Sequence, residues 1–452
     1  MPNTAHKFEF TSFQLALDRK SIYFHYKIYF TQGNEDIFEE IIYLPNAIPS
    51  AIPDQLLTSI LFSLHLMLGI SYYKMHCAPK INIKSGYLSK EQAEFWNIVY
   101  QKGLGEFFFR NQIDFRNLVH FPFTQDKVAP SVLYERLNKS LLGVGGGKDS
   151  LVAYELLQKA NKNFSTLVIE SSHSYPIIDQ LLHHFNLEHI RIKRSLDKKI
   201  FEYNKKNTVF NGHIPVSAIN AFIGVFVCLI YNYQYFIVSN ERSANFGNVE
   251  YMGMQINHQW SKSIEFELLF QAYITKFISP SVTYFSLLRP LSEFAIVKLF
   301  SAYHSYFSLF SSCNSNYKIE GNPFNEKWCC KCPKCAFVFC MLSAFLPKKT
   351  VINIFGSNLY ENKNLLMIYR QLWGTQDIKP FECVGTPDEV KIAFYLTYKK
   401  KEFVHNPVME TFEKEILPHI KNPEQQMNIL LKREDVNSIP VEFRSIIAQL
   451  PL

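Results

Sequence analysis

The sequence predicts an α/β protein: a parallel sheet with helices on both faces, an N-terminal α+β domain before it and a mostly helical C-terminal region after it. Three observations predict this class. Short apolar runs alternate with helix-like segments in the middle of the chain, a glycine-rich turn links the first run to a helix, and helical patterns dominate from residue 292 onward. We place the three parts at residues 1–135, 136–300 and 301–452.

The N-terminal part begins with a strand pattern. Apolar and polar residues alternate across residues 8–44, as in an antiparallel meander with one buried face, and three prolines follow closely. Residues 56–68 and 90–103 then show helical patterns. Strands followed by helices predict an α+β domain.

The middle part alternates strands with helices, the order that produces a parallel sheet covered on both faces. The expected strands lie at residues 141–143, 166–169, 190–192, 236–239 and 283–287. The expected helices lie between them, at residues 150–160, 177–185, 216–231 and 264–277. Ligands of open parallel sheets bind outside the carboxyl ends of the strands, so we expect the functional site at that edge.

The amino-acid composition excludes several classes of protein. Apolar residues make up 47% of the 452 positions and charged residues only 19%, which excludes a disordered chain. The most apolar window, residues 216–231, is shorter than the roughly twenty residues that span a bilayer, and the first eight residues lack a signal-peptide core. Nine unevenly spaced cysteines fit a reducing compartment. We expect a soluble, cytoplasmic protein with no membrane partner.

The net charge of +7 is spread along the chain, and the densest basic run is three lysines at residues 399–401. Such a diffuse excess suits an anionic small molecule as well as RNA, and a merely solvated surface explains it equally well. Because no concentrated basic face appears, we expect no nucleic-acid partner. The sequence leaves the oligomeric state open.

The glycine-rich turn is the most informative segment. An apolar strand runs into Gly145, Gly146, Gly147, Lys148, Asp149 and Ser150, and a helix pattern follows. Unpaired backbone N–H groups and the helix dipole at such a turn favour a phosphate, and glycines let the phosphate approach the backbone. A plain strand-to-helix turn would not need the three polar residues that end this segment.

Two common phosphate motifs are excluded. The Walker A motif would require glycine at Leu142 and Ser or Thr at Asp149. The dinucleotide fingerprint, counted from Gly143, would require glycine at Lys148. The segment instead resembles the S-G-G-x-D-S loop of the PP-loop ATP pyrophosphatases, with Gly145 in place of the usual serine. That resemblance implies cleavage of ATP to AMP and pyrophosphate.

A cysteine cluster is the second signal. Cys332 and Cys335 form a C-x-x-C pair, and Cys313 and Cys329 complete four thiolates, the ligand set of a structural zinc site. The spacing resembles the zinc clip of PP-loop enzymes that make deazaguanine nucleobases, except that Cys330 occupies a glycine position. Cys330 is also an alternative ligand, whereas Cys340, in an apolar helix, is expected to be packed. Two other interpretations of the cluster stay open, namely redox-active cysteines and ordinary reduced cysteines.

Polar residues gather after several expected strands. Ser171 follows the second strand, at the edge that usually meets adenosine in PP-loop enzymes. Further polar segments lie at residues 170–174, 211–215, 239–245 and 257–265. An ordinary turn or helix cap explains any single one of them as well as a ligand contact does.

Taken in order, six segments resemble one family, the UDP-N-acetylmuramoyl-L-alanyl-L-glutamate epimerases (MurL). They are residues 69–74, 144–150, 239–245, 257–263, 328–335 and 379–386. The resemblance implies a bacterial enzyme that inverts the terminal L-Glu of UDP-MurNAc-L-Ala-L-Glu to D-Glu for peptidoglycan synthesis. It also implies ATP and Mg²⁺ as requirements and AMP and pyrophosphate as products.

The resemblance assigns roles to the glycine turn. Gly145, Gly146, Gly147 and Ser150 would hold the phosphates, Lys148 would neutralise developing charge, and Asp149 would position Mg²⁺ or the loop. The acid and base of the inversion are left open among Tyr72, Tyr73, Lys74, Glu241, His258 and Lys262. A structural role is the stronger alternative for each of these six, and His213 alone is expected to be structural.

Two rival functions fit parts of the sequence. A PP-loop enzyme that modifies a nucleobase or tRNA fits the loop and the cysteines, and it predicts a tRNA or purine-like acceptor. A nucleotide-binding sensor fits the loop alone, and it predicts ATP binding without AMP formation.

Overall fold

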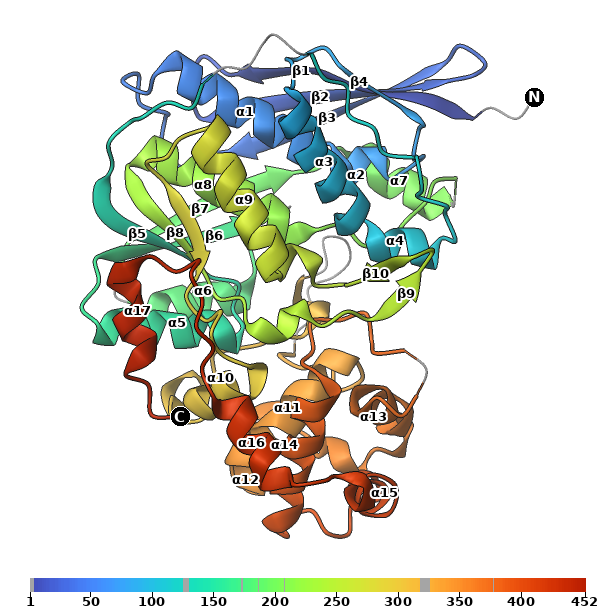
Figure 1. The fold of residues 1–452 in the computed structure, drawn as a ribbon, viewed down its shortest axis with the longest axis vertical. Helices are drawn as coiled ribbons and strands as arrows, with labels where there is room; N and C mark the ends of the chain where they lie inside the picture. The colour runs from blue at the N-terminus through green and yellow to red at the C-terminus, as the bar shows by residue number, and fades with distance from the viewer. Residues whose placement is uncertain are drawn as a thin grey trace.

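The computed structural model is built around one nine-stranded mixed sheet, with strand order β11-β8-β5-β6-β7-β3-β2-β1-β4. The blue strands lie at one end of the molecule and most of the orange-to-red helices at the other (Figure 1). The described residues are 4–124, 130–171, 174–185, 187–206, 208–317, 326–376 and 378–452.

Five strands form the parallel half of the sheet. Each pairs in parallel with its neighbour, so their carboxyl ends share one edge. They are β5 (Leu137–Gly143), β6 (Phe164–Glu170), β7 (His189–Ser195), β8 (Tyr233–Val238) and β11 (Thr283–Ser286). All five strands expected in the middle of the chain are confirmed.

The N-terminal meander is also confirmed, as β1 (Ala5–Leu15), β2 (Ser21–Phe30) and β3 (Glu35–Tyr43), and β4 (Lys80–Ile83) pairs with β1. β3 pairs antiparallel with β7, so the sheet continues across residue 135. The buried pair of Glu40 and Arg194, 2.6 Å apart, joins these two strands. The domain boundary expected at residue 135 therefore does not separate two sheets.

Helices cover both faces of the sheet, as predicted. Successive strand residues point to opposite faces: Leu141 lies in one core and Leu142 in the other, and Phe236 and Ile237 divide in the same way. The first core includes residues of α1 (Asp54–Leu68), α3 (Lys90–Gly103), α8 (Val216–Tyr231) and α9 (Ile264–Phe277). The second includes α5 (Lys148–Lys159), α6 (Pro176–His184) and α10 (Glu293–Phe300).

The C-terminal region is helical, as expected, and its last helix returns to the sheet. Phe443 packs against Tyr235 and Phe285, with ring centroids 5.0 Å apart in both pairs. The helices are α11 (Pro333–Phe345), α12 (Lys348–Phe355), α13 (Leu366–Trp373), α14 (Pro387–Lys399), α15 (Pro407–Glu415), α16 (Pro423–Leu431) and α17 (Val441–Ala448).

The sequence pattern missed several short elements. They are α2 (Ile70–Tyr73), α4 (Gly105–Arg110), α7 (Lys198–Lys206), β9 (Val249–Tyr251) and β10 (Met254–Ile256). Apart from α7, which has nine residues, these elements have six residues or fewer, too few for a clear period. Residues 54–73 form the one described helical run long and apolar enough to cross a membrane, and 83% of its apolar window is buried inside the fold.

Candidate functional site

The glycine turn joins β5 to α5 at the carboxyl edge of the parallel strands. Gly146 has a φ of +77°, a conformation that other residues adopt only with strain. Gly147 caps α5 without any side-chain hydrogen bond, so the first N–H groups of the helix have no side-chain cap. The turn therefore has the backbone geometry of an anion cradle.

A later segment lies against this turn. The Ser311 N–H donates to the Gly146 carbonyl at 3.1 Å, and the Ser312 hydroxyl lies 3.0 Å from where a Gly147 side chain would begin. A side chain on Gly146 would begin 2.6 Å from the Tyr317 hydroxyl, whereas the space beside Gly145 is open. Gly145 thus has room for the serine usual in PP-loop enzymes.

We expect Gly146→Ala to lower the free energy of unfolding by about 1–3 kcal/mol, because alanine at this φ is strained and its Cβ approaches Tyr317. The matched control is Gly145→Ala, which meets no neighbour and should change stability by less than about 0.5 kcal/mol. Urea denaturation of both variants checks this, and equal midpoints would contradict the assigned backbone conformation.

The two serines assigned to the nucleotide have partners within the protein. The Ser150 hydroxyl donates to the Gly147 carbonyl at 2.9 Å. Ser171 follows β6, and its hydroxyl is 2.8 Å from the Tyr175 hydroxyl. Ser172 and His173, in the same polar segment, lie outside the described residues. Because β6 is adjacent to β5, Ser171 shares the sheet edge with the glycine turn.

Lys148 and Asp149 begin a buried cluster of charges. The Lys148 ammonium is 1% exposed, lies 2.5 Å from the Asp149 carboxylate and also pairs with Glu293 at the start of α10. Burial opposes its charge, but these two carboxylates raise the pKa of Lys148. Burial raises the pKa of Glu293 to about 8. Lys148 therefore acts first as the counter-ion of Asp149 and as a hydrogen-bond donor to Glu293.

Glu241, which follows β8, and Lys262, at the end of a short 3₁₀ helix (Trp260–Lys262), extend the cluster. Burial raises the pKa of Glu241, and the nearby Lys262 opposes the rise. Arg289 holds the backbone of both residues, donating to the Glu241 carbonyl at 2.8 Å and to the Lys262 carbonyl at 2.7 Å. Its guanidinium is fixed in turn by a fully buried pair with Glu267, 2.8 Å away.

His258 connects the cluster to the N-terminal part of the chain. Its Nδ1 lies 2.5 Å from the Glu106 carboxylate of α4, and the rings of His258 and His213 are 4.5 Å apart. Burial opposes its charge, but Cys383 and Glu106 raise the pKa of His258 to about 9. Burial lowers the pKa of His213 to about 3. One histidine is therefore a cation and the other is neutral at pH 7.

Glu106, His213 and His258 are close enough to hold a metal ion, since their donor atoms lie within 4.8 Å of one another. However, Arg110 already donates to the Glu106 carboxylate at 2.7 Å, and Lys74 faces His213. The positive charges of Arg110 and Lys74 disfavour a metal cation at this place. We therefore assign the three residues as a hydrogen-bond network.

The other acid–base candidates, Lys74, Tyr72 and Tyr73, do not all lie in the cluster. Lys74 donates to the Gly212 carbonyl at 2.7 Å, and burial lowers its pKa to about 8. Tyr72 stacks on Tyr26 with ring centroids 4.7 Å apart, and Tyr73 packs against Phe8 in the aromatic core. The structure therefore gathers Glu241, Lys262 and His258, leaves Lys74 at the His213 end, and places the two tyrosines in the N-terminal core.

Sequence reasoning missed other members of the cluster, namely Glu106, Glu293, Lys334 and Cys383, and it assigned His213 a structural role. Their charge types are ordinary, and only the fold brings them together. For Lys334 and Cys383 a signal existed, because each lies in one of the six segments noted above. That signal suggested no role.

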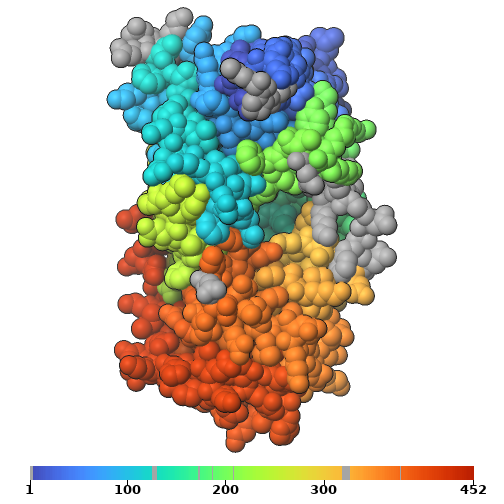
Figure 2. Space-filling view, turned by 90° about the vertical axis from the view of Figure 1, so that its right-hand side faces the viewer, coloured from blue at the N-terminus to red at the C-terminus, as the bar shows by residue number. Residues whose placement is uncertain are grey.

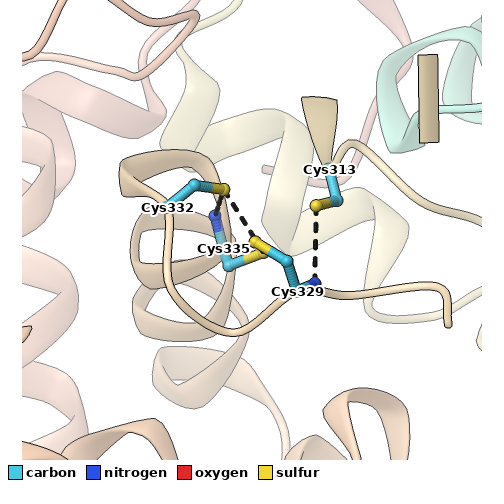
Figure 3. A group of neighbouring side chains, drawn as sticks. All are labelled: Cys313, Cys329, Cys332 and Cys335. Atoms are coloured by element: carbon cyan, nitrogen blue, oxygen red, sulfur yellow. Dashed lines mark hydrogen bonds between the residues drawn. The ribbon is translucent and has the colours of Figure 1, made fainter. Parts of the chain in front are cut away.

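The four predicted cysteines converge from two segments (Figure 3). Their sulfur atoms lie within 4.8 Å of one another, with Cys335 3.5 Å from Cys332 and 3.7 Å from Cys329. Sulfurs bound to one tetrahedral zinc would be about 3.8 Å apart, given a Zn–S length of about 2.3 Å. Cys313 accepts the Cys329 N–H at 3.4 Å. These four residues therefore fit the donor set of a structural zinc.

The neighbouring cysteines are not part of this set. The Cys330 thiol points to the Phe355 carbonyl, 3.4 Å away, and its φ of +55° explains why glycine is usual at this position. Cys340 is fully buried in α11, as expected.

The surface is hollowed beside the cluster. Figure 2 shows a recess between the blue-to-green part and the orange C-terminal part, with teal atoms at its floor, the colour of the segment that includes β5 and α5. A cavity of about 390 Å³ is lined by Arg110 on one side and by Lys379 and Glu382 on the other.

Together, the fold and the cluster define an α/β protein with a glycine turn and a buried cluster of ionisable groups at one sheet edge. Residues 1–287 match the family model described as "MurL N-terminal domain", and residues 309–427 match "MurL C-terminal domain". The chain belongs to the MurL family, which confirms the resemblance drawn from the six sequence segments.

Full-length relatives support this membership. A protein of Xanthomonas oryzae pv. oryzae (strain MAFF 311018) is 36% identical over 91% of this chain and 90% of its own length. A protein of Micromonospora sp. (strain ATCC 39149) is 34% identical over 89% of each chain, and one of Salinispora tropica is 33% identical over 89% of this chain and 87% of its own. All three are named UDP-N-acetyl-alpha-D-muramoyl-L-alanyl-L-glutamate epimerase.

Proposed function

We propose that this protein inverts the terminal L-Glu of UDP-MurNAc-L-Ala-L-Glu to D-Glu, using ATP and Mg²⁺ and releasing AMP and pyrophosphate. The names of three relatives that match about 90% of the chain support the substrate. The observation that carries the proposal is the meeting of a glycine turn and a buried acid–base cluster at one sheet edge. PP-loop membership and a cytoplasmic location remain predictions.

The chemistry of inversion explains why both the glycine turn and the acid–base cluster are needed. The α-proton of a carboxylate is hard to remove, because the carbanion would lie beside an existing negative charge. Adenylation removes that charge and makes the carbonyl an electron sink. A base then takes the α-proton, reprotonation on the other face inverts the centre, and hydrolysis of the acyl-adenylate releases the product.

The residues of the turn fit the nucleotide. The N–H groups of Gly145, Gly146 and Gly147 would hold phosphate oxygens, and Ser150 would assist from the first turn of α5. Asp149 would hold Mg²⁺, which supplies positive charge to the phosphates when bound. Burial opposes ionisation of Asp149, but Lys148 and Lys334 lower its pKa, so the carboxylate is charged at neutral pH.

Incubation with ATP, Mg²⁺ and UDP-MurNAc-L-Ala-L-Glu tests the proposal. We expect pyrophosphate release that depends on the dipeptide substrate, together with D-Glu in the product after acid hydrolysis. AMP formation that requires tRNA or a purine-like acceptor would support the nucleobase-modifying alternative instead. ATP binding without AMP would support the sensor. Either result would overturn the proposed function.

We also propose that the four convergent cysteines hold one structural Zn²⁺. Metal analysis of the purified protein should find about one zinc per chain, and Cys332→Ser should lose it and unfold at a lower temperature. Cys340→Ser is the matched control, because that thiol lies outside the set and should leave the zinc content unchanged. A zinc-free protein of full stability would contradict the assignment.

A further inference from the structure

The cavity between α4 and the loop of residues 378–382 has a volume of about 390 Å³. Small-molecule sites have volumes of about 300–1,000 Å³. The Asn248 amide, just before β9, fixes the loop by donating to the carbonyls of Lys379, at 3.2 Å, and Pro380, at 3.0 Å. None of the described residues that line the cavity belongs to the glycine turn, so the cavity is a second candidate binding site.

Lys379 lines this cavity as a buried cation without a partner. Only 7% of the residue is exposed, yet among the described residues its ammonium has no hydrogen-bond acceptor and no ion pair. It lies over the ring of Phe246, 5.1 Å from the centroid. Burial lowers the pKa of Lys379 to about 8, because Glu389 and Glu241 act on it only from beyond ion-pair distance. A buried ammonium in these surroundings favours an anionic ligand.

Arg110 supplies a second cation from the end of α4. Its Nε donates to Glu106 at 2.7 Å, whereas its two terminal amino groups donate to none of the described residues. The guanidinium lies over the Phe381 ring, with 4.7 Å between its central carbon and the ring centroid. A guanidinium held in this way presents its two remaining groups as a fork, the geometry that suits phosphate oxygens.

An aromatic pair and a carboxylate complete the polar and planar part of the lining. The ring centroids of Phe109 and Phe381 are 5.5 Å apart. Glu382 lines the same cavity and accepts a hydrogen bond from the Asn314 amide at 2.5 Å. Aromatic faces stack on nucleobases, and carboxylates accept hydrogen bonds from ribose hydroxyls. Two cations, an aromatic pair and a carboxylate around one cavity therefore match a nucleoside diphosphate.

One short segment connects the cavity to the glycine turn. The Ser311 N–H donates to the Gly146 carbonyl at 3.1 Å, and Asn314, three residues later, donates to Glu382. Three residues span at most about 11 Å, so the turn lies close to this wall of the cavity. A substrate with a nucleoside diphosphate at one end and a carboxylate to be activated at the other can therefore reach both places.

We propose that this cavity binds the uridine diphosphate end of the substrate, with Lys379 and Arg110 on the diphosphate and the Phe109–Phe381 pair on the uracil. The inference rests on the proposed function, whose substrate carries this group. ATP also contains a diphosphate, but the glycine turn offers a separate cradle for the phosphates of ATP. The cavity is therefore assigned to the second nucleotide.

Binding of UDP to the full-length protein, measured by isothermal titration calorimetry without ATP, tests the site independently of turnover. We expect Lys379→Met to weaken UDP binding by about 10–100-fold, the effect of losing a charge-assisted hydrogen bond. Its urea midpoint should equal or exceed that of the wild type, because the variant removes a buried cation without a partner. A lysine with a purely structural role would give a lower midpoint and unchanged UDP binding, which would overturn the inference.

The matched control is Lys399→Met. Lys399 lies on α14, is about half exposed and pairs with Glu424 at 2.8 Å. This variant should bind UDP as the wild type does. Phe381→Leu keeps an apolar side chain but removes the aromatic face, and it should weaken UDP binding by about 5–100-fold.

Steady-state kinetics distinguish the two nucleotides. Lys379→Met and Phe381→Leu should each raise the KM for UDP-MurNAc-L-Ala-L-Glu at least about fivefold and leave the KM for ATP within about twofold. A rise in the KM for ATP alone would assign the cavity to ATP and overturn the inference, as would a wild-type protein that does not bind UDP. If the wild type binds UDP as expected but releases no pyrophosphate with the dipeptide substrate, the proposed function fails while the UDP site stands.

Discussion

Asp149→Ala is expected to abolish ATP-dependent pyrophosphate release, reducing the rate by at least about 10²–10³-fold. Asp149 is the carboxylate of the glycine turn, and it shares the buried Lys148 with Glu293. Its loss removes the proposed Mg²⁺ ligand and leaves Lys148 paired with Glu293 alone. Measurement of pyrophosphate with saturating ATP and substrate checks the effect.

The control for this variant is Asp114→Ala, because Asp114 pairs with Arg116 on the surface and both side chains are about half exposed. The control should retain the wild-type rate. Asp149→Asn keeps the shape but not the charge, and it should be as inactive as the alanine variant. Near-normal release by Asp149→Ala would show that the turn is not the ATP site.

Arg289→Met is expected to have the largest effect on stability, about 3–5 kcal/mol, because it leaves the buried Glu267 carboxylate without its partner. Both side chains of this pair are 1% exposed. The change also frees the carbonyls of Glu241 and Lys262, which Arg289 holds in place. Urea denaturation followed by circular dichroism measures the loss.

A surface pair provides the comparison for Arg289. Arg370 and Glu415 lie 2.7 Å apart with about two fifths of each side chain exposed, and Arg370→Met should cost less than about 1 kcal/mol. Arg289→Lys keeps the charge but cannot donate to Glu267 and both carbonyls at once. We expect this variant to fold and to lose more inversion than pyrophosphate release. Equal stability of Arg289→Met and Arg370→Met would contradict the argument.

Much of the fold was predictable because its signals are local. Strand and helix periods in the middle of the chain marked all five parallel strands and the helices between them except α7. The continuity of the sheet was not predictable, because the pairing of β3 with β7 joins residues about 150 positions apart. The Glu40–Arg194 pair, which fixes that junction, has no signature in either segment.

The site was also predictable only in part, because only some of its residues lie in segments with a local sequence signal. The glycine turn and the four cysteines are recognisable because each group is nearly contiguous in sequence. Tyr73 and Lys74 are neighbours in sequence, yet the first packs in the aromatic core and the second reaches Gly212 beside the histidines. The direction in which a side chain points depends on how its helix packs. The spacing of residues in the sequence did not show that packing here.

The sequence by itself determined the class of fold, the glycine turn, the four-cysteine set and the family, because each depends on short-range order of residue types. Only the tertiary structure decided which ionisable groups meet. Glu106, Glu241, Lys262 and Cys383 come from four distant segments, and their protonation depends on burial and on one another's charges. Those two quantities exist only in the folded chain, so the cluster of ionisable groups could be located only there.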